Sequence, residues 1–469
     1  MLKVDDLVIT VGAKGNEVVL LRGADLRIPA GSSLLIQGER GSGKSTLCKV
    51  LCGELEPRFG TVESDALIID DADAMDPTVL ADLLDRRTSQ GKTTVLLATD
   101  GSLPTDRVCR LARGTLCYID EESRSVPEPL RVPPATLKER SAAALRAAGS
   151  SDETATLVAD VLVEADVRGH HSHGVGLLPT YLTRVRQGGI DPLAEPVLTE
   201  QGAVARVDAR NGFGQPAAAM AADWCAATAA RLGVAAVAVH SNNHVGMMAA
   251  YRWPFQRQGV AGLLFNISGP SLAAPGAARP TLGSNAICMV TPTAAVEPFV
   301  VDFATGVVSI GKIRAAAQRG DQVPSEWLLD SRGRPSSNPL DLEKGGSVPV
   351  FGDYKGLCVT LIAEVIAGIL GGHTVSPLVV KQRAEPGRPM GCTQLFVGLS
   401  TTAFGLDAER TSIDKLLQTL RDAVLAGYPG QPPTPYFPDQ AEAAWTARAH
   451  ETGIPVPAAV ATALGWSER

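Results

Sequence analysis

A proline-rich segment limits how this chain can fold more than any other feature of its sequence. Residues 121–135 read EESRSVPEPLRVPPA, with prolines at positions 127, 129, 133 and 134. Proline fixes the backbone and removes an amide donor, so the segment favours an extended tether over regular structure. A length of 469 residues also exceeds one ordinary domain. The sequence therefore predicts two folding units, residues 1–122 and 135–469, joined by a linker over 123–134.

Composition and charge exclude several classes of protein. The formal net charge of -7 provides no basic footprint, so we expect no nucleic-acid partner. The amino terminus, MLKVDDLVIT, lacks the pattern of an export signal. The apolar run over residues 356–372 contains Glu364, and we interpret it as a buried helix, so we expect no membrane segment in this chain. The cysteines show no CxxC pairing, which favours reduced thiols and a cytoplasmic location.

A glycine-rich loop in the first unit has the pattern of a phosphate-binding loop. A strand expected over residues 33–37 leads into GERGSGKST, and a mostly apolar helix follows. In such a loop the backbone amides face phosphate oxygens, the lysine contacts the β and γ phosphates, and a hydroxyl binds magnesium. Ser45 is the expected magnesium ligand. We expect ATP to contact the following residues: Gly38, Gly41, Ser42, Gly43, Lys44, Ser45 and Thr46.

The first unit resembles the nucleotide-binding domain of ABC transporters through LRGADLRIPAGSSLLIQGERGSGKSTL, ELEPRFGTV and ALIIDDADAMDP. The resemblance implies that Asp70 is the Walker B aspartate, which holds magnesium through water together with Ser45. Asp71 stands where that family usually has its catalytic glutamate, and Asp100 where it has the switch histidine. The glutamine loop, helical subdomain and LSGGQ signature are missing. We expect ATP binding with weak or no hydrolysis. The alternative is a docking remnant with an empty loop.

Histidines are concentrated in the second unit. Five of the seven lie between His170 and His244, within RGHHSHGVGLLPTY and near SNNHVG. Imidazole exchanges protons near neutral pH, so the cluster favours catalysis over ordinary core or loop histidines. A zinc site is a further interpretation, because His240 precedes His244 by four residues. That spacing shares a face only on a helix, whereas this stretch reads as a strand followed by a loop.

Apolar periodicity in the second unit predicts a large mixed sheet flanked by helices. Helices are expected over residues 137–148, after Ser151, and over 177–185 up to the glycine pair at 188 and 189. Strands are expected over residues 234–239, 260–266, 286–291 and 299–303. No GxGxxG follows a strand here, so the Rossmann fingerprint is missing.

From about residue 131 to 469 the chain resembles the type 2 malate/L-lactate dehydrogenase family. The carrying segments are ADVRGHHSHGVGLLPTYLTRVRQGGIDP, NGFGQ, SNNHVG, PTLGSNAI, VDFATGVVSIGKIRAA and GDYKGL with AEVIAGILGG. The resemblance implies a non-Rossmann fold that binds NAD or NADP, a homodimer, and hydride transfer involving a 2-hydroxy acid, a 2-oxo acid or a cyclic imine. The expected fold class is therefore α/β in both units, with a P-loop domain of the ABC ATPase type first.

The resemblance also implies roles for particular residues. His173, in the SHG motif, is expected to donate a proton, with Ser172 assisting, and His244 is the competing acid or base. Tyr181 matches a family tyrosine. Asp302 ends an apolar strand, where it either orients a histidine or caps a helix. Contacts with the cofactor are expected from Asn266, Ser268, Thr305, Lys312, Tyr354, Lys355 and Gly356, although the two lysines are alternatively solvated surface charges.

One departure concerns the substrate. Several family members place an arginine four residues after the SHG histidine, where it clamps a carboxylate, and this chain has Leu177. Either another cation, such as Arg184 or Arg314, takes that role, or the small-molecule substrate is less polar. Two functions are therefore in view: an NAD(P)-dependent oxidoreductase with an appended ATP-binding module, and a non-catalytic ATP-sensing scaffold whose dehydrogenase-like half is degenerate.

Overall fold

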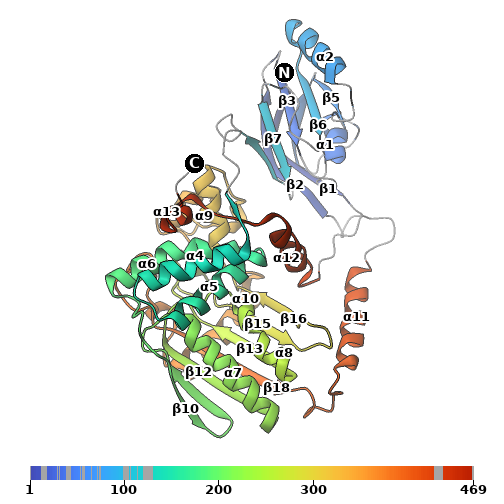
Figure 1. Cartoon of the computed structure of the whole chain (residues 1–469). Helices are drawn as coiled ribbons and strands as arrows, with labels where there is room; N and C mark the ends of the chain where they lie inside the picture. Colours follow the sequence, from blue (N-terminus) through green and yellow to red (C-terminus); the bar gives the residue numbers. More distant parts are fainter. Residues whose placement is uncertain are drawn as a thin grey trace. The chain divides into compact units, whose positions relative to one another are not determined.

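Figure 1 shows the computed structural model of the chain. The described residues are 2–11, 18–28, 30, 32–37, 44–52, 54, 59–64, 66–70, 72, 75, 77–98, 105, 107–112, 115–119, 130–426 and 437–466. The chain divides into two compact units, Met1–Glu128 and Pro129–Arg469, which are treated separately below. The last residues of the expected linker already belong to the second unit, because Arg131–Val132 form strand β9 and helix α4 begins at Pro134.

Two sheets form the first unit. The antiparallel one has the order β2-β1-β4, built from Val18–Ile28, Leu2–Val11 and Phe59–Ser64. The other has the order β5-β6-β3-β7-β8, built from Leu67–Ile69, Thr94–Ala98, Ser33–Gln37, Arg107–Ala112 and Thr115–Ile119. All neighbours in this second sheet are parallel except β7 and β8.

Helices cover both faces of the five-stranded sheet. Side chains alternate along β3, so Leu34 and Ile36 share one buried cluster, whereas Leu35 belongs to another. Helix α1, Lys44–Leu51, packs in the first cluster, and α2, Pro77–Ser89, packs in the second. Because both faces are buried, the strands read as continuous apolar runs.

The second unit is organised around a seven-stranded mixed sheet in the order β10-β11-β12-β18-β13-β15-β16. Only β11 and β12 are parallel. The strands are Val197–Gln201, Val204–Asp208, Val234–Asn242, Cys392–Ser400, Val260–Asn266, Ile287–Thr291 and Phe299–Phe303. The four strands expected from the sequence are confirmed, with β12 running on to Asn242.

Helix α7, Gly214–Leu232, covers one face of this sheet (Figure 1). Its buried side chains are mostly alanines, which pack against the valines of β11 and β12. Small side chains let the helix approach closely, and a Cβ added at Gly398 would lie 2.8 Å from the Ala229 Cβ. The short helix α8, Trp253–Gln258, adds Phe255 to the same core.

A layer of helices carries the histidine stretch. It contains α4 (Pro134–Ala147), α5 (Asp152–Val167), α6 (Leu178–Gln187) and α13 (Ala458–Ala463) around one apolar cluster. The Ser151 hydroxyl accepts a hydrogen bond from the Thr154 amide at 3.2 Å, which confirms the expected helix start. Gly188 ends α6 in a left-handed conformation, with φ of 84°.

The remaining elements lie along the other parts of the second unit. Strands β14 (Leu272–Ala273) and β17 (Val348–Pro349) pair in parallel, and β9 pairs with β19 (Ile454–Pro455). Helices are α9 (Ile310–Arg319), α10 (Asp353–Ala363), α11 (Thr411–Leu425) and α12 (Gln440–Thr452). A π-helical segment, Glu364–Leu370, continues α10.

The expectation of a buried helix over residues 356–372 is wrong about its burial. The helix forms, but Leu361, Ile362, Val365, Ile369 and Leu370 are between 45% and 69% exposed. The π-helical segment widens the last turns, and only one side of the helix meets the sheet. An apolar face is therefore left without cover in a single chain.

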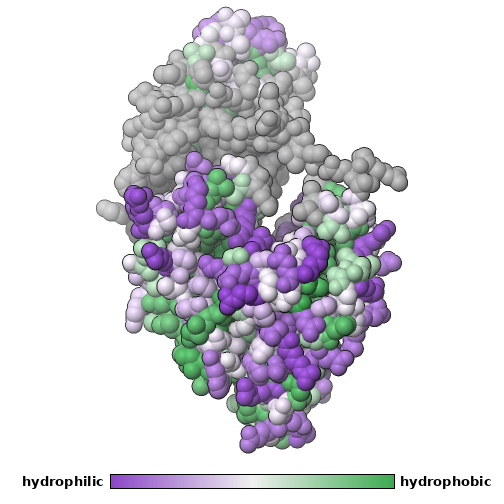
Figure 2. All heavy atoms as spheres, turned by 90° about the vertical axis from the view of Figure 1, so that its left-hand side faces the viewer, coloured by the Kyte–Doolittle hydropathy of each residue, from purple (hydrophilic) through white to green (hydrophobic). Residues whose placement is uncertain are grey.

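The surface is mixed elsewhere. Figure 2 shows a face of the second unit on which hydrophilic and hydrophobic side chains are interspersed. No helix in the described part of the chain is long and apolar enough to cross a membrane.

Candidate active site

The end of α5 and two 3₁₀ turns hold the histidine stretch. The turns are His171–His173 and Val175–Leu177, and they lead directly into α6. His170 Nε2 lies 3.4 Å from the Glu442 carboxylate on α12. The ring of His171 meets that of Trp445 edge to face, with centroids 5.3 Å apart. Two of the three histidines therefore have structural partners on α12.

The buried side chain of Asp166 holds this turn in place. Its carboxylate accepts hydrogen bonds from His171 Nδ1 at 2.8 Å and from the Val175 amide at 2.7 Å. Burial raises the pKa of Asp166, and the bonds from His171 and Val175 oppose that rise. A Cβ at Gly174 would lie 2.2 Å from the Asp166 carboxylate, so only glycine fits there. The turn has little freedom to move.

His173 instead faces His244. The two rings are stacked, with centroids 5.6 Å apart and planes 15° from parallel. The Ser172 hydroxyl lies 3.0 Å from His173 Nδ1. The structure thus brings His244 to Ser172 and His173, which lie about seventy residues earlier in the sequence.

A chain of hydrogen bonds fixes the ring of His244. Gln215 Nε2 donates to the Tyr181 hydroxyl at 3.1 Å, and that hydroxyl lies 2.7 Å from His244 Nδ1. The Gly246 amide also points at Nδ1, at 3.2 Å. An N–H facing Nδ1 requires a lone pair there, so we assign the Tyr181 O–H as donor. The neutral His244 ring then carries its proton on Nε2.

Both imidazoles are biased toward the neutral form. Burial, followed by the charge of His170, lowers the pKa of His173 to about 4. Burial, followed by the charges of His173, Arg184 and Arg383, lowers the pKa of His244 to about 3. Burial also raises the pKa of Tyr181, against the hydrogen bond from Gln215. All three groups are therefore uncharged at neutral pH.

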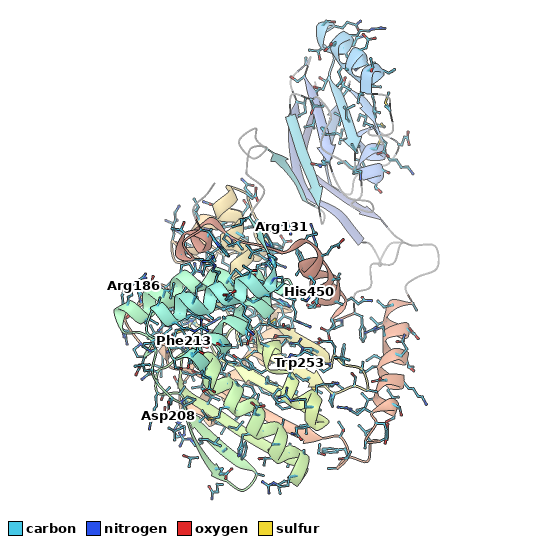
Figure 3. The ribbon with its side chains drawn as sticks, viewed as in Figure 1. Arg131, Arg186, Asp208, Phe213, Trp253 and His450 are labelled. Carbon is cyan, nitrogen blue, oxygen red and sulfur yellow. The ribbon has the colours of Figure 1, made fainter. Side chains whose placement is uncertain are left out.

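An apolar wall supports these polar groups. The Tyr181 ring packs edge to face on Phe213, with centroids 6.1 Å apart. Phe213, labelled in Figure 3, lies at the start of α7 and belongs to the core of the helical layer. Leu177 is 5% exposed and packs in that same core. The position at which an arginine was expected from the resemblance thus contributes to packing.

Both alternative cations have partners within the unit. Arg184 has no exposed surface, and its Nη2 donates to the carbonyls of Gly189 and Arg388 and to Asn243 Oδ1, at 2.7 to 3.0 Å, whereas its buried Nε and Nη1 have no partner among the described residues. Arg314 Nε is paired with the Glu343 carboxylate at 2.9 Å. Arg184 therefore fastens backbone segments together, and Arg314 already has an anionic partner.

Asp302 lies apart from the stacked pair. Its carboxylate accepts a hydrogen bond from the Ala249 amide at 2.9 Å, so it caps the short 3₁₀ turn Met248–Tyr251. Burial raises the pKa of Asp302, and the charges of His170 and Arg168 act in the opposite direction. The charge of His170 thus acts on Asp302, and an orienting role toward His173 or His244 stays a prediction.

The residues expected to contact the cofactor form a connected group. Asn242 Nδ2 donates to Gln394 Oε1, and Gln394 Nε2 donates to Asn266 Oδ1, both at 2.8 Å. This amide chain joins the ends of β12 and β13 across β18. Asn266 is therefore tied to the segment that carries His244.

A second series of contacts continues from Ser268. The Ser284 amide donates to the Ser268 hydroxyl at 3.1 Å, and the Thr305 amide donates to the Ser284 carbonyl at 3.0 Å. The Phe351 amide donates to the Thr305 carbonyl at 3.0 Å. The Thr305 hydroxyl is buried and has no partner in the described part of the chain. These bonds thus connect the end of β13 to the segment just before α10.

The start of α9 links this group to the histidines. A Cβ at Gly311 would lie 2.3 Å from the Ser172 Cβ, so α9 is in close contact with the turn that carries Ser172 and His173. Lys312 follows on α9 and is exposed, as are Tyr354 and Lys355 on α10. Gly356 is buried against the Phe351 carbonyl, where a Cβ would lie within 1.5 Å. Donor hydroxyls, amides and exposed cations are present, as a nicotinamide dinucleotide requires.

In the first unit only part of the ATP site is described. Residues 38–43 lie outside the described residues, as do Asp71 and Asp100. Lys44 begins α1, followed by Ser45 and Thr46, and Asp70 directly follows β5. Both elements follow parallel strands, so they lie at the same carboxyl edge of the sheet. No group of three His, Cys, Asp or Glu side chains that could hold a metal occurs among the residues described here.

Two residues of the site were not anticipated. Asp166 hydrogen-bonds to His171, and Gln215 orients Tyr181. The sequence feature that points to Asp166 is a carboxylate among the apolar positions at the end of α5. Gln215 lies in the NGFGQ segment, but nothing in its spacing points to a tyrosine on another helix.

Comparison with known proteins agrees with this architecture. A family model described as malate/L-lactate dehydrogenase matches residues 132–465, and one described as ABC transporter matches residues 21–109. Δ1-Pyrroline-2-carboxylate reductase of Ancylobacter novellus is 30% identical over 338 residues, covering 71% of this chain and 96% of that protein. An NADP-dependent (2R)-3-sulfolactate dehydrogenase of Chromohalobacter salexigens is 36% identical over 233 residues, covering 49% and 69%. The crystal structure of Δ1-piperideine-2-carboxylate reductase from Pseudomonas syringae superposes with a TM-score of 0.64 at 28% identity, covering 72% of this chain and all of that one (100%).

Proposed function

Because the chain belongs to the malate/L-lactate dehydrogenase family, we propose that its second unit is an NAD(P)-dependent oxidoreductase acting on a 2-hydroxy acid, a 2-oxo acid or a cyclic imine carboxylate. The observation that carries the proposal is the stacked His173 and His244 pair, with Ser172 and Tyr181 bonded to its two Nδ1 atoms. A protein that only bound a partner would not need two depressed imidazole pKa values in one place.

The two histidines divide the proton chemistry. Since Nδ1 of His244 is occupied as an acceptor, its neutral ring offers an N–H to a substrate oxygen or nitrogen. His173 is the group that exchanges the proton, with Ser172 holding its ring. In oxidation, neutral His173 accepts the hydroxyl proton; in reduction, protonated His173 returns it to oxygen or nitrogen.

The nicotinamide cofactor supplies or accepts hydride when bound. Asn266, Ser268 and Thr305 offer amide and hydroxyl groups, and the amide chain through Gln394 and Asn242 joins Asn266 to the segment that carries His244. Lys312 and Lys355 are exposed cations for phosphate groups. Tyr354 and Gly356 complete this segment, where glycine lets α10 begin against Phe351.

Turnover tests the proposal. Oxidation of NADH and NADPH is followed with a panel of 2-oxo acids and cyclic imine carboxylates, and with 2-hydroxy acids in the reverse direction. We expect activity with at least one class, abolished in His173→Ala. Cofactor binding without turnover on any compound favours the second candidate, a non-catalytic scaffold.

We further propose that the first unit binds ATP with magnesium and hydrolyses it weakly or not at all. Lys44 at the start of α1, with Ser45, and Asp70 after β5 occupy the expected edge of the sheet. Calorimetry on the full chain with ATP and magnesium tests this, with Lys44→Ala as the variant expected to lose binding. Equal affinity in the two proteins refutes it.

A homodimer is proposed from the exposed face of α10 and its π-helical extension. Leu361, Ile362, Val365, Ile369 and Leu370 are exposed together on this helix, and a second copy of the chain would remove them from water. Sedimentation analysis of Val365→Glu checks the proposal, since a charge at this face should give monomers. The cytoplasmic location stays a prediction.

A further inference from the structure

Glu364 is a buried carboxylate on the helix that carries the exposed apolar face. It lies where α10 passes into the π-helical segment, and it is 5% exposed. One of its carboxylate oxygens accepts a hydrogen bond from Asn285 Nδ2 at 2.7 Å, and the other accepts one from the Ser376 amide at 2.9 Å. A buried carboxylate is costly, and π-helical turns are frequent at functional sites. The position of Glu364 therefore indicates a role beyond packing.

The carboxylate fixes the direction in which the amide of Asn285 points. A side-chain amide has one donating end and one accepting end, whereas a carboxylate only accepts. Nδ2 of Asn285 therefore faces Glu364, and its Oδ1 faces two other donors. These donors are the Ser268 amide at 3.2 Å and the Ser376 hydroxyl at 3.3 Å. Without a carboxylate at position 364, nothing in these contacts would favour one end of the amide over the other.

The amide of Asn285 supports a residue that is expected to contact the cofactor. Ser268 donates its amide to Asn285 Oδ1, and its hydroxyl accepts the hydrogen bond from the Ser284 amide at 3.1 Å. Space around these groups is narrow, because a Cβ added at Gly283 would lie 2.3 Å from both Asn285 Oδ1 and the Ser268 carbonyl. A reversed Asn285 amide would bring its N–H groups against the Ser268 amide and displace this segment.

Other contacts hold the π-helical segment against the same stretch without involving Asn285. A Cβ added at Gly368 would lie 3.3 Å from the Ile267 Cδ1. The Thr393 hydroxyl donates to the Ala367 carbonyl at 2.6 Å, and the Thr393 carbonyl accepts from the Ile267 amide at 3.1 Å. The stability of this helix can therefore be perturbed separately from the direction of the Asn285 amide.

We propose that Glu364 is a positioning residue for the nicotinamide cofactor, which acts by orienting the Asn285 amide and thereby holding Ser268 in its binding conformation. The inference rests on the proposed oxidoreductase function and adds to it a residue that acts through another. A segment that is already held in its bound conformation loses less freedom when the cofactor binds, so the affinity for the cofactor is higher.

Binding of NADH and NADPH to the full chain, followed by the fluorescence of the reduced nicotinamide, tests the inference. Glu364→Gln preserves the size of the side chain but offers one acceptor to two N–H donors, and we expect it to raise the Kd by about 10-fold. The double variant Glu364→Gln with Asn285→Asp exchanges carboxylate and amide, so each donor again faces an acceptor. It should regain the wild-type Kd to within about threefold.

Thr393→Val is the matched control, because it removes a buried hydrogen bond to the same π-helical segment and leaves Asn285 untouched. It should lower the melting temperature and change the Kd by no more than about twofold. An unchanged Kd in Glu364→Gln overturns the inference, as does an equal rise in Thr393→Val. A double variant that folds without regaining the affinity also overturns it, even if Glu364→Gln alone does not fold.

The outcome for the wild-type chain separates this inference from the function on which it rests. If the wild-type chain binds neither NADH nor NADPH, the oxidoreductase proposal fails and the inference fails with it. If the wild-type chain binds either cofactor and Glu364→Gln binds it equally well, only the inference fails.

Discussion

Replacing Tyr181 with phenylalanine removes one oxygen from the centre of the site. That oxygen receives a hydrogen bond from Gln215 at 3.1 Å and contacts His244 Nδ1 at 2.7 Å. The ring itself keeps its contact with Phe213, so the packing is preserved. The variant therefore isolates the hydroxyl from the rest of the side chain.

The loss of stability follows from burial. Gln215 has no exposed surface, and its Oε1 already lacks a partner in the described residues. Without the Tyr181 hydroxyl its Nε2 also loses its acceptor, and such a buried unsatisfied group costs about 1–3 kcal/mol in the free energy of unfolding. The pKa of His244 should rise from about 3, because the lost donor stabilised the neutral ring.

The effect on catalysis follows from the tautomer. Once the Tyr181 O–H is gone, only the Gly246 amide still faces Nδ1, so the tautomer and orientation of the His244 ring are held by one donor instead of two. We expect kcat/KM to fall by about 10- to 100-fold, which corresponds to about 1.4–2.8 kcal/mol in the barrier. Steady-state kinetics, urea unfolding and nitrogen NMR of the imidazoles measure the three effects.

Tyr251→Phe is the matched control. Tyr251 is equally buried and its hydroxyl donates to the Val245 carbonyl, but it does not bond to an imidazole. It should lose stability without changing the His244 pKa or kcat/KM by more than about twofold. If Tyr181→Phe and Tyr251→Phe behave alike in kinetics and NMR, the tautomer argument is refuted.

Three further perturbations probe the surroundings. Protonated His173 is scarce above its pKa of about 4, so the rate of reduction should fall as pH rises from 5 to 8. The rate of oxidation should fall only below about pH 4. A reduction rate that rises with pH contradicts this prediction. Asp166→Asn should lower the free energy of unfolding by about 1–3 kcal/mol in a urea titration, because one of the two donors, His171 Nδ1 or the Val175 amide, then faces an amide N–H. An unchanged free energy of unfolding argues against this role of Asp166. Gly311→Ala should lower the free energy of unfolding by about 1–3 kcal/mol and displace Ser172. The control is Gly176→Ala, which should do neither, because the nearest neighbour of a Cβ there is 3.7 Å away. Equal melting temperatures for the two variants count against the contact between Gly311 and Ser172.

Local patterns predicted much of the second unit. Apolar runs bounded by glycine- and proline-rich turns located β13, β15 and β16, and the Ser151 cap and Gly188 stop located the start of helix α5 and the end of helix α6. These features depend on neighbours within one or two turns of chain, which a sequence displays directly.

Contacts between distant segments were harder to foresee. The bond between Gln215 and Tyr181 depends on how α7 crosses α6, and the bond between Met390 and Asn243 depends on where a loop without regular structure is fastened. The prediction that residues 356–372 are buried is wrong because apolar content does not distinguish a core helix from one with an exposed apolar face. Motifs identified His173 and His244, whereas their stacking required the folded chain.

The close approach of Gly311 to Ser172 also bears on how such a site can diverge. A Cβ added at Gly311 would lie only 2.3 Å from the Ser172 Cβ, and Gly174 is equally confined by Asp166, so the turn tolerates almost no change in volume. New substrate preferences must then arise outside this turn, at positions whose side chains have room to change volume. Laboratory evolution libraries aimed at new acids should therefore leave Gly174 and Gly311 unchanged.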